Sequence, residues 1–249
     1  MNWTIFRRMA SAVVIAGALS GVLLSGVQQL QVEKIILKAE QYEKAGEAAE
    51  HAHQHEVAAS AAAAGAAPVA AAEHEHEHGH DGDEWEPADG AERTGYTVLA
   101  NVSMAIGFAL MMVAAIAVSG RQVSWRSGLL WGLAGYVVFF VAPSLGLPPE
   151  VPGTLAAPLH ARQWWWVMTA GLTAGGLGAI VYARAWPWKL LGVLLLAVPH
   201  VIGAPQPEVH GGVAPEELAR AFIHATAMAN AVFWLALGGL TGFFYRKLA

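Results

Sequence analysis

The sequence contains no cysteine among its 249 residues. Neither a disulfide framework nor a thiolate metal site can exist, so any metal must be bound by imidazole, carboxylate, thioether or backbone groups. The GxxxxGK[ST] phosphate-binding loop is also missing, and no arrangement of serine residues favours a hydrolase. We therefore expect that the protein is not an enzyme.

Charged residues are scarce as well, at 13% of the chain, whereas 55% of the residues are hydrophobic. The lysines and arginines are scattered between apolar runs and form no basic patch, which excludes a nucleic-acid partner. Several of these runs approach the roughly 20 residues that an α-helix needs to cross a bilayer. The sequence therefore predicts an all-α, polytopic bundle of transmembrane helices in the lipid bilayer.

Six spans are predicted, with five as the alternative. They cover residues 9–30, 96–118, 128–147, 164–183, 188–202 and 221–245. The fifth is the weakest because Pro199 and Gly203 interrupt it after about 15 residues, which is short for a full span. No aspartate or glutamate lies in the middle of any span, so the sequence offers no obvious proton relay.

The distribution of lysine and arginine favours six spans with both termini in the cytoplasm. Each short segment on the inner side then carries two basic residues, namely Arg7 with Arg8, Arg121 with Arg126, Arg184 with Lys189, and Arg246 with Lys247. This is the asymmetry that the positive-inside rule requires. The N-terminal run also resembles a signal peptide, but no small-x-small cleavage site follows it, which favours a retained span.

Residues 47–92 hold seven histidines and twelve carboxylates without a single lysine or arginine. We interpret residues 31–93 as a disordered, extracytoplasmic loop between a first span in residues 1–30 and a five-helix bundle in residues 94–249. An alanine-rich stretch, residues 58–72, reads as a flexible tether within it. It separates two clusters of metal-ligand candidates: His51, His53 and His55, then His74, His76, His78 and His80.

Imidazole together with carboxylate suits cobalt, nickel, zinc or copper, so this loop predicts capture of a divalent metal ion. A pH-sensing role is the alternative, because imidazole also titrates in the physiological range. Six further residues on the outer side are candidates for an ion pathway: Glu150, His160, His200, Glu208, His210 and His224.

Translocation also requires polar groups within the spans, and these are few. The candidates are Gln28 and Gln29 in the first span, Asn101, Ser103 and Met104 in the second, and His224, Met228 and Asn230 in the last. Glycines recur four residues apart as Gly17 and Gly21, Gly128 and Gly132, Gly171 and Gly175, and Gly238 and Gly242. Such pairs predict close helix–helix packing and carry no information on substrate.

The chain resembles the CbtA family of cobalt transporter subunits. The resemblance rests on WEPADGAERTGYTVLANV, VAPSLGLPPEVPG, ARQWWWVMTAGLTA, PHVIGAPQPE and FWLALGGLTGFFYRK. It implies a multi-pass protein of the bacterial inner membrane, linked to cobalt supply for cobalamin biosynthesis and accompanied by a small single-span, histidine-bearing partner, CbtB. The alanine-rich insert that divides the histidines departs from the family pattern and leaves open whether one or two metal sites form.

Three functions follow from these patterns. The first is transport of a divalent cation, with Co²⁺ favoured over Ni²⁺ or Zn²⁺ and no resident cofactor. The second is a metal-binding accessory or sensor subunit that does not itself conduct ions. The third is a haem-binding redox subunit with His200 and His224 as axial ligands.

Overall fold

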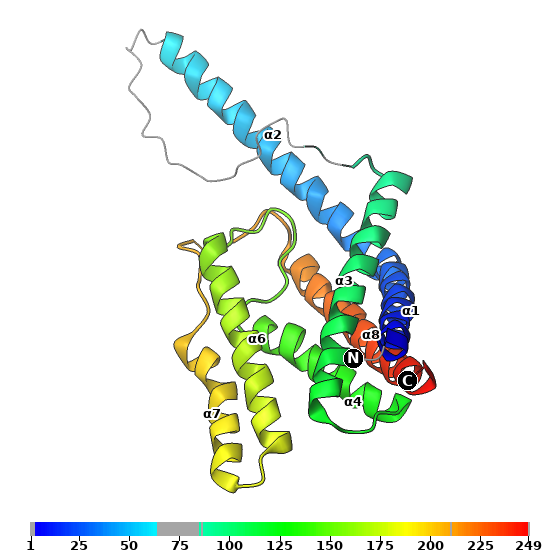
Figure 1. The fold of residues 1–249 in the computed structure, drawn as a ribbon. Helices are drawn as coiled ribbons and strands as arrows, with labels where there is room; N and C mark the ends of the chain where they lie inside the picture. The colour runs from blue at the N-terminus through cyan, green and yellow to red at the C-terminus, as the bar shows by residue number, and fades with distance from the viewer. Residues whose placement is uncertain (1–2, 64–84, 86, 210, 249) are drawn as a thin grey trace.

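The computed structural model describes residues 3–63, 85, 87–209 and 211–248 (Figure 1). Its elements are α1 Trp3–Val27, the π-helix η1 Gln28–Val32, α2 Glu33–Ala63, α3 Ala91–Ser119, α4 Trp125–Tyr136, the π-helix η2 Val137–Val141, α5 Ala142–Ser144, α6 Leu159–Tyr182, α7 Trp186–Ile202 and α8 Glu216–Leu248. The described residues contain no β-strand, and one isolated bridge joins Thr154 to Gly212. The predicted all-α fold is confirmed.

Five helical stretches are long and apolar enough to cross a membrane. They are the continuous run of α1, η1 and α2, then α3, the run from α4 to α5, α6, and α8. Helix α7, the weak fifth span of the prediction, is a shorter apolar helix of 17 residues that continues through Pro199 to Ile202. At 1.5 Å per residue it is about 26 Å long, at the lower limit for a span.

Successive helices alternate in direction, so both chain termini lie at the end of the bundle opposite α2 (Figure 1). Gly120, with a φ of 63° in the left-handed region, ends α3, and Ser124 begins α4 as its N-cap in a reciprocal capping box with Ser127. At the other end, the connections after α5 and after α7 are joined by the Thr154–Gly212 bridge. The turn after α3 brings α3 and α4 together at one end, and the bridge fastens the two connections at the α2 end to each other.

The core lies between α1, α3, α4 and α8, where α8 packs against α1 and α4 and α1 packs against α3. An aromatic cluster joins α8 to α3 and to η2, the π-helix that follows α4. Trp234 of α8 stacks on Phe139 of η2 with ring centroids 5.4 Å apart and contacts Phe108 of α3 at 4.8 Å. Helices α6 and α7 form a separate hairpin beside this core (Figure 1).

Three of the four predicted glycine pairs lie at helix crossings. A Cβ on Gly21 would stand 2.5 Å from Cα of Val102 in α3, and Gly128 and Gly238 face each other between α4 and α8. The fourth pair, Gly171 and Gly175, has no neighbour within 4 Å of the added Cβ among the residues described. Its neighbour Gly176 makes the close approach instead, against Gly192 of α7.

The structure corrects one prediction: Glu33–Ala63, the first half of the expected flexible loop, is α-helical and continuous with α1. Alanine, glutamate, lysine and glutamine dominate this segment, and all four are strong helix formers. A helix that leaves the membrane also needs no new nucleus, so extending it costs less than starting one. Residues 64–84, with most of the predicted tether and the second histidine cluster, lie outside the described residues.

Candidate functional site

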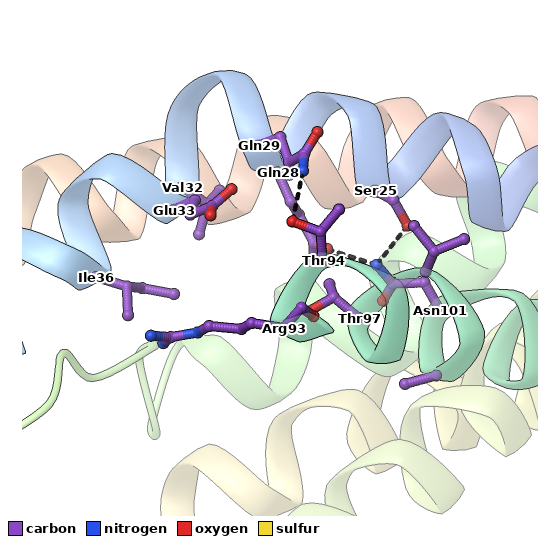
Figure 2. Close-up of a pocket in the computed structure, with 12 residues that line it drawn as sticks. Ser25, Gln28, Gln29, Val32, Glu33, Ile36, Arg93, Thr94, Thr97 and Asn101 are labelled. Atoms are coloured by element: carbon purple, nitrogen blue, oxygen red, sulfur yellow. Dashed lines mark hydrogen bonds between the residues drawn. The ribbon is translucent and has the colours of Figure 1, made fainter. Parts of the chain in front are cut away.

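A pocket of about 310 Å³ lies where the first helix passes α3 (Figure 2). Its polar lining consists of Ser25, Gln28, Gln29, Glu33, Arg93, Thr94, Thr97 and Asn101, and its apolar lining includes Val32, Ile36 and Val98. The pocket adjoins the start of α2, at the α2 end of the bundle. It gathers more polar groups than the rest of the described bundle interior, where buried polar side chains are isolated serines and threonines.

Asn101 is the centre of the hydrogen bonds in this pocket. Its buried amide nitrogen Nδ2 donates to Oγ of Ser25 at 3.0 Å and to Oε1 of Gln28 at 2.6 Å. Closer to the α2 end of the pocket, Nε2 of Gln29 donates to Oγ1 of Thr94 at 3.0 Å (Figure 2). In a bilayer such interhelical bonds hold helices in register, because the unpaired groups would otherwise face hydrocarbon.

The sequence identified Gln28, Gln29 and Asn101 as polar groups within spans but gave no pairing between them. It missed Ser25 and Thr94, which bond directly to those amides. Ser25 lies three residues before Gln28 and therefore shares its helix face, which is a signal that helix periodicity could have supplied.

The five residues of η1 form a single short π-helical segment at the pocket wall. The backbone N–H of Glu33 donates to the carbonyl of Gln28, five residues earlier, whereas an α-helical N–H donates to the carbonyl four residues earlier. Single π-turns of this kind occur frequently at functional sites, where they alter which side chains face a neighbouring helix. Here the π-turn carries both glutamines to α3.

An ion-pair cluster closes the side of the pocket that faces α2. Nη2 of Arg93 lies 2.5 Å from Oε1 of Glu40, and its Nη1 lies 3.0 Å from Oδ1 of Asp89. The side chains of Arg93 and Glu40 are only 31% and 22% exposed. One cation faces two carboxylates, so the rim keeps a net negative charge and the only guanidinium at the pocket is already paired.

The first histidine cluster lies on the outer half of α2. His51, His53 and His55 are all exposed and all within the helix. His74, His76, His78 and His80 lie outside the described residues, as does His210.

The remaining described pathway candidates lie towards the α2 end of the bundle but do not converge. His160 lies in the first turn of α6, His200 near the end of α7 and His224 in the third turn of α8, all three exposed. Glu150 pairs with Arg162 at 3.0 Å, and the exposed Glu208 follows α7. Within the described ranges, no group of three or more histidine, aspartate or glutamate side chains could hold a metal ion.

The other polar candidates within spans lie away from the pocket. Ser103, Met104 and Met228 are exposed on the outside of the bundle. The amide of Asn230 donates to the carbonyl of Thr226 in its own helix at 3.0 Å. The structure thus selects Gln28, Gln29 and Asn101 from the eight residues that the sequence offered.

Comparison with known families adds the identity that the geometry alone does not give. The model of a family described as "Probable cobalt transporter subunit (CbtA)" matches residues 6–246, from α1 to the last turn of α8. No curated protein and no solved structure matches the chain. Because the match covers nearly the whole chain and the fold is a bundle of membrane-length apolar helices, the chain is a multi-pass membrane protein that belongs to the CbtA family of probable cobalt transporter subunits.

Proposed function

We propose that this chain moves Co²⁺ inward across the bacterial inner membrane, with both termini in the cytoplasm, and that the histidines beyond α1 capture the ion outside. Ni²⁺ and Zn²⁺ are the competing ions, because nitrogen and oxygen ligands do not separate them from Co²⁺. A small partner subunit, CbtB, fits the description of the family as a transporter subunit.

One observation carries this proposal: every described histidine lies towards the α2 end of the bundle. The four pairs of neighbouring basic residues lie at the other end, namely Arg7 with Arg8, Arg121 with Arg126, Arg184 with Lys189, and Arg246 with Lys247. Helix α2, the start of α6, the end of α7 and the first turns of α8 bear the histidines (Figure 1). Imidazoles on the outside can bind the ion, and lysines and arginines hold the opposite end in the cytoplasm.

The pocket around Asn101 supplies the first polar surface inside the bundle along this route. Its amide and hydroxyl dipoles can solvate a hydrated cation, and the carboxylates at its rim attract one. The pocket offers no imidazole, so an ion would pass through it with water attached. Inward movement is favoured by the membrane potential, by roughly 4.6 kcal/mol per 100 mV for a divalent ion at about 2.3 kcal/mol per charge.

A metal-binding accessory subunit is the second candidate. It is favoured by the finding that the described helices bring no three metal-ligating side chains together inside the membrane region. In that role α2 would bind the ion and pass it to another protein.

Proteoliposomes separate these two functions. The purified chain is reconstituted alone around a Co²⁺-quenched fluorophore, and protein-free liposomes provide the control. Quenching that requires the chain and grows with an inside-negative potential supports transport. Co²⁺ binding to the outer surface without quenching would assign the accessory role, and quenching that appears only after addition of CbtB would make this chain a partner-dependent subunit.

A further inference from the structure

The helical geometry of α2 divides its three histidines into two sets. Residues of an α-helix are about 100° apart around the axis, so His51 and His55 lie one turn apart on one face. His53 lies about 200° from each and faces the other way. Two imidazoles spaced i, i+4 on one helix face can bind the same metal ion, as in the HExxH arrangement.

We propose that His51 and His55 bind one divalent transition-metal ion between them on α2, and that His53 takes no part. This inference rests on the proposed function, since it names the ligands of the capture step. Glu47 lies one further turn towards the membrane on the same face and adds a negative charge beside the ion. The ligand class is a first-row divalent cation, because imidazole nitrogen selects Co²⁺, Ni²⁺, Cu²⁺ or Zn²⁺ over Mg²⁺ and Ca²⁺.

A site with two protein ligands leaves the other coordination positions to water. Structural zinc sites, in contrast, are closed by four protein ligands and hold the ion permanently. No third histidine or carboxylate completes the pair within the described part of α2. The ion on His51 and His55 is therefore exchangeable, which suits a capture step that precedes release.

The position of the pair along α2 agrees with this role. His51 lies 18 residues beyond Glu33 at the pocket wall, which corresponds to about 27 Å along a straight helix. The captured ion must leave α2 before it reaches the pocket around Asn101. A tightly closed site at that distance would retain the ion and block transport.

An extended chain would behave differently, which makes the inference testable. In extended backbone alternate residues point to the same side, so His51, His53 and His55 would be equivalent ligands. In the helix only the outer two are paired. Unequal effects of the three histidines therefore report the helical site itself.

The test uses the full-length chain in detergent, with His74, His76, His78 and His80 replaced by alanine so that they do not mask α2. Co²⁺ is titrated by calorimetry into this parent and into variants carrying His51→Ala, His53→Ala or His55→Ala. Loss of a group that only hydrogen-bonds to a metal ligand already costs about 10- to 100-fold in metal affinity. His51→Ala and His55→Ala each remove a ligand itself, so we expect each to weaken binding by at least about tenfold. His53→Ala is the matched control and should leave the affinity unchanged.

A rescue variant makes the test independent of folding defects. Glu47→His combined with His55→Ala again places two imidazoles one turn apart, and it should restore most of the affinity that His55→Ala removes. Equal losses for the three alanine variants, a failed rescue in a protein that elutes as the parent does, or no Co²⁺ binding by the parent would overturn the proposal. Binding that follows the expected pattern in a chain that moves no Co²⁺ would instead refute the proposed transport and leave this site in place.

Discussion

Arg93 in the first turn of α3 and Glu40 on α2 form a two-point ion pair, with Nη2–Oε1 and Nη1–Oε2 distances of 2.5 and 3.2 Å. This pair fixes the base of α2 against the bundle directly above the pocket. Because α2 carries His51, His53 and His55, the pair also determines where these three histidines lie relative to the pocket.

Glu40→Gln should loosen α2. The pair is partly buried and charge-assisted, so its loss should cost about 1 kcal/mol of stability, although Asp89 still pairs with Arg93. The absence of native cysteine allows spin labels at Ala48→Cys and Glu208→Cys without background, and the distance distribution between them should broaden. The control is Glu47→Gln, whose carboxylate has no ion pair in the described part of the chain. Equal broadening in both variants would contradict the role of the Arg93–Glu40 pair in holding α2 in place.

Asn101→Leu should weaken both the bundle and transport. The change removes two interhelical hydrogen bonds of about 0.6 kcal/mol each and leaves Ser25 and Gln28 without their donor, so we expect a loss of about 1–2 kcal/mol. Thermal unfolding in detergent measures the stability, and Co²⁺ uptake measures the function. Ser103→Ala on the outer face of the same helix is the control, and uptake equal to the parent in both variants would remove the pocket from the pathway.

Two adjacent glycines in α6 should respond in opposite ways to alanine. In Gly176→Ala the new methyl group would lie 2.7 Å from the carbonyl oxygen of Gly192, so α7 must shift at a cost of about 1–3 kcal/mol. In Gly175→Ala no described neighbour lies within 4 Å of the new methyl group, and the helix gains up to about 1 kcal/mol in propensity. The melting temperature should fall in the first variant and hold or rise in the second; a fall in both would mean that Gly175 also contacts a neighbour.

Single cysteines should map the number of crossings. If α7 spans the membrane, a membrane-impermeant thiol reagent applied to intact cells labels Ala48→Cys and Glu208→Cys but not Gln122→Cys or Ala185→Cys. If α7 does not cross, positions 185 and 208 lie on one side and are labelled alike. Labelling after the cells are opened confirms that each cysteine is accessible.

The fold could be predicted largely because the bilayer imposes strict rules on sequence. Apolar runs of fixed length, paired basic residues and glycines four residues apart follow directly from burying helices in hydrocarbon. The extension of α1 into Glu33–Ala63 could not be predicted with the same ease. Histidine and alanine repeats are compatible with a tether or a helix, and continuity with α1 decides between them.

The site was harder to predict than the fold. Single polar residues such as Gln28 and Asn101 can be found in the sequence, but their pairing depends on the register between α1 and α3 and on the π-turn at η1. For Gly171 and Gly175 the spacing predicts a helix contact that the structure places one residue away, at Gly176. Spacing identifies a face of a helix, whereas neighbours decide whether that face is used.

Uptake of labelled cobalt by cells tests the central claim most directly. The chain is compared with a variant in which every histidine from His51 to His80 is alanine, with Ni²⁺ and Zn²⁺ as competitors. We expect uptake that depends on the chain and that weakens in the variant chiefly at low cobalt, where capture limits the rate. Uptake no greater than in cells without the chain would contradict transport by this protein alone.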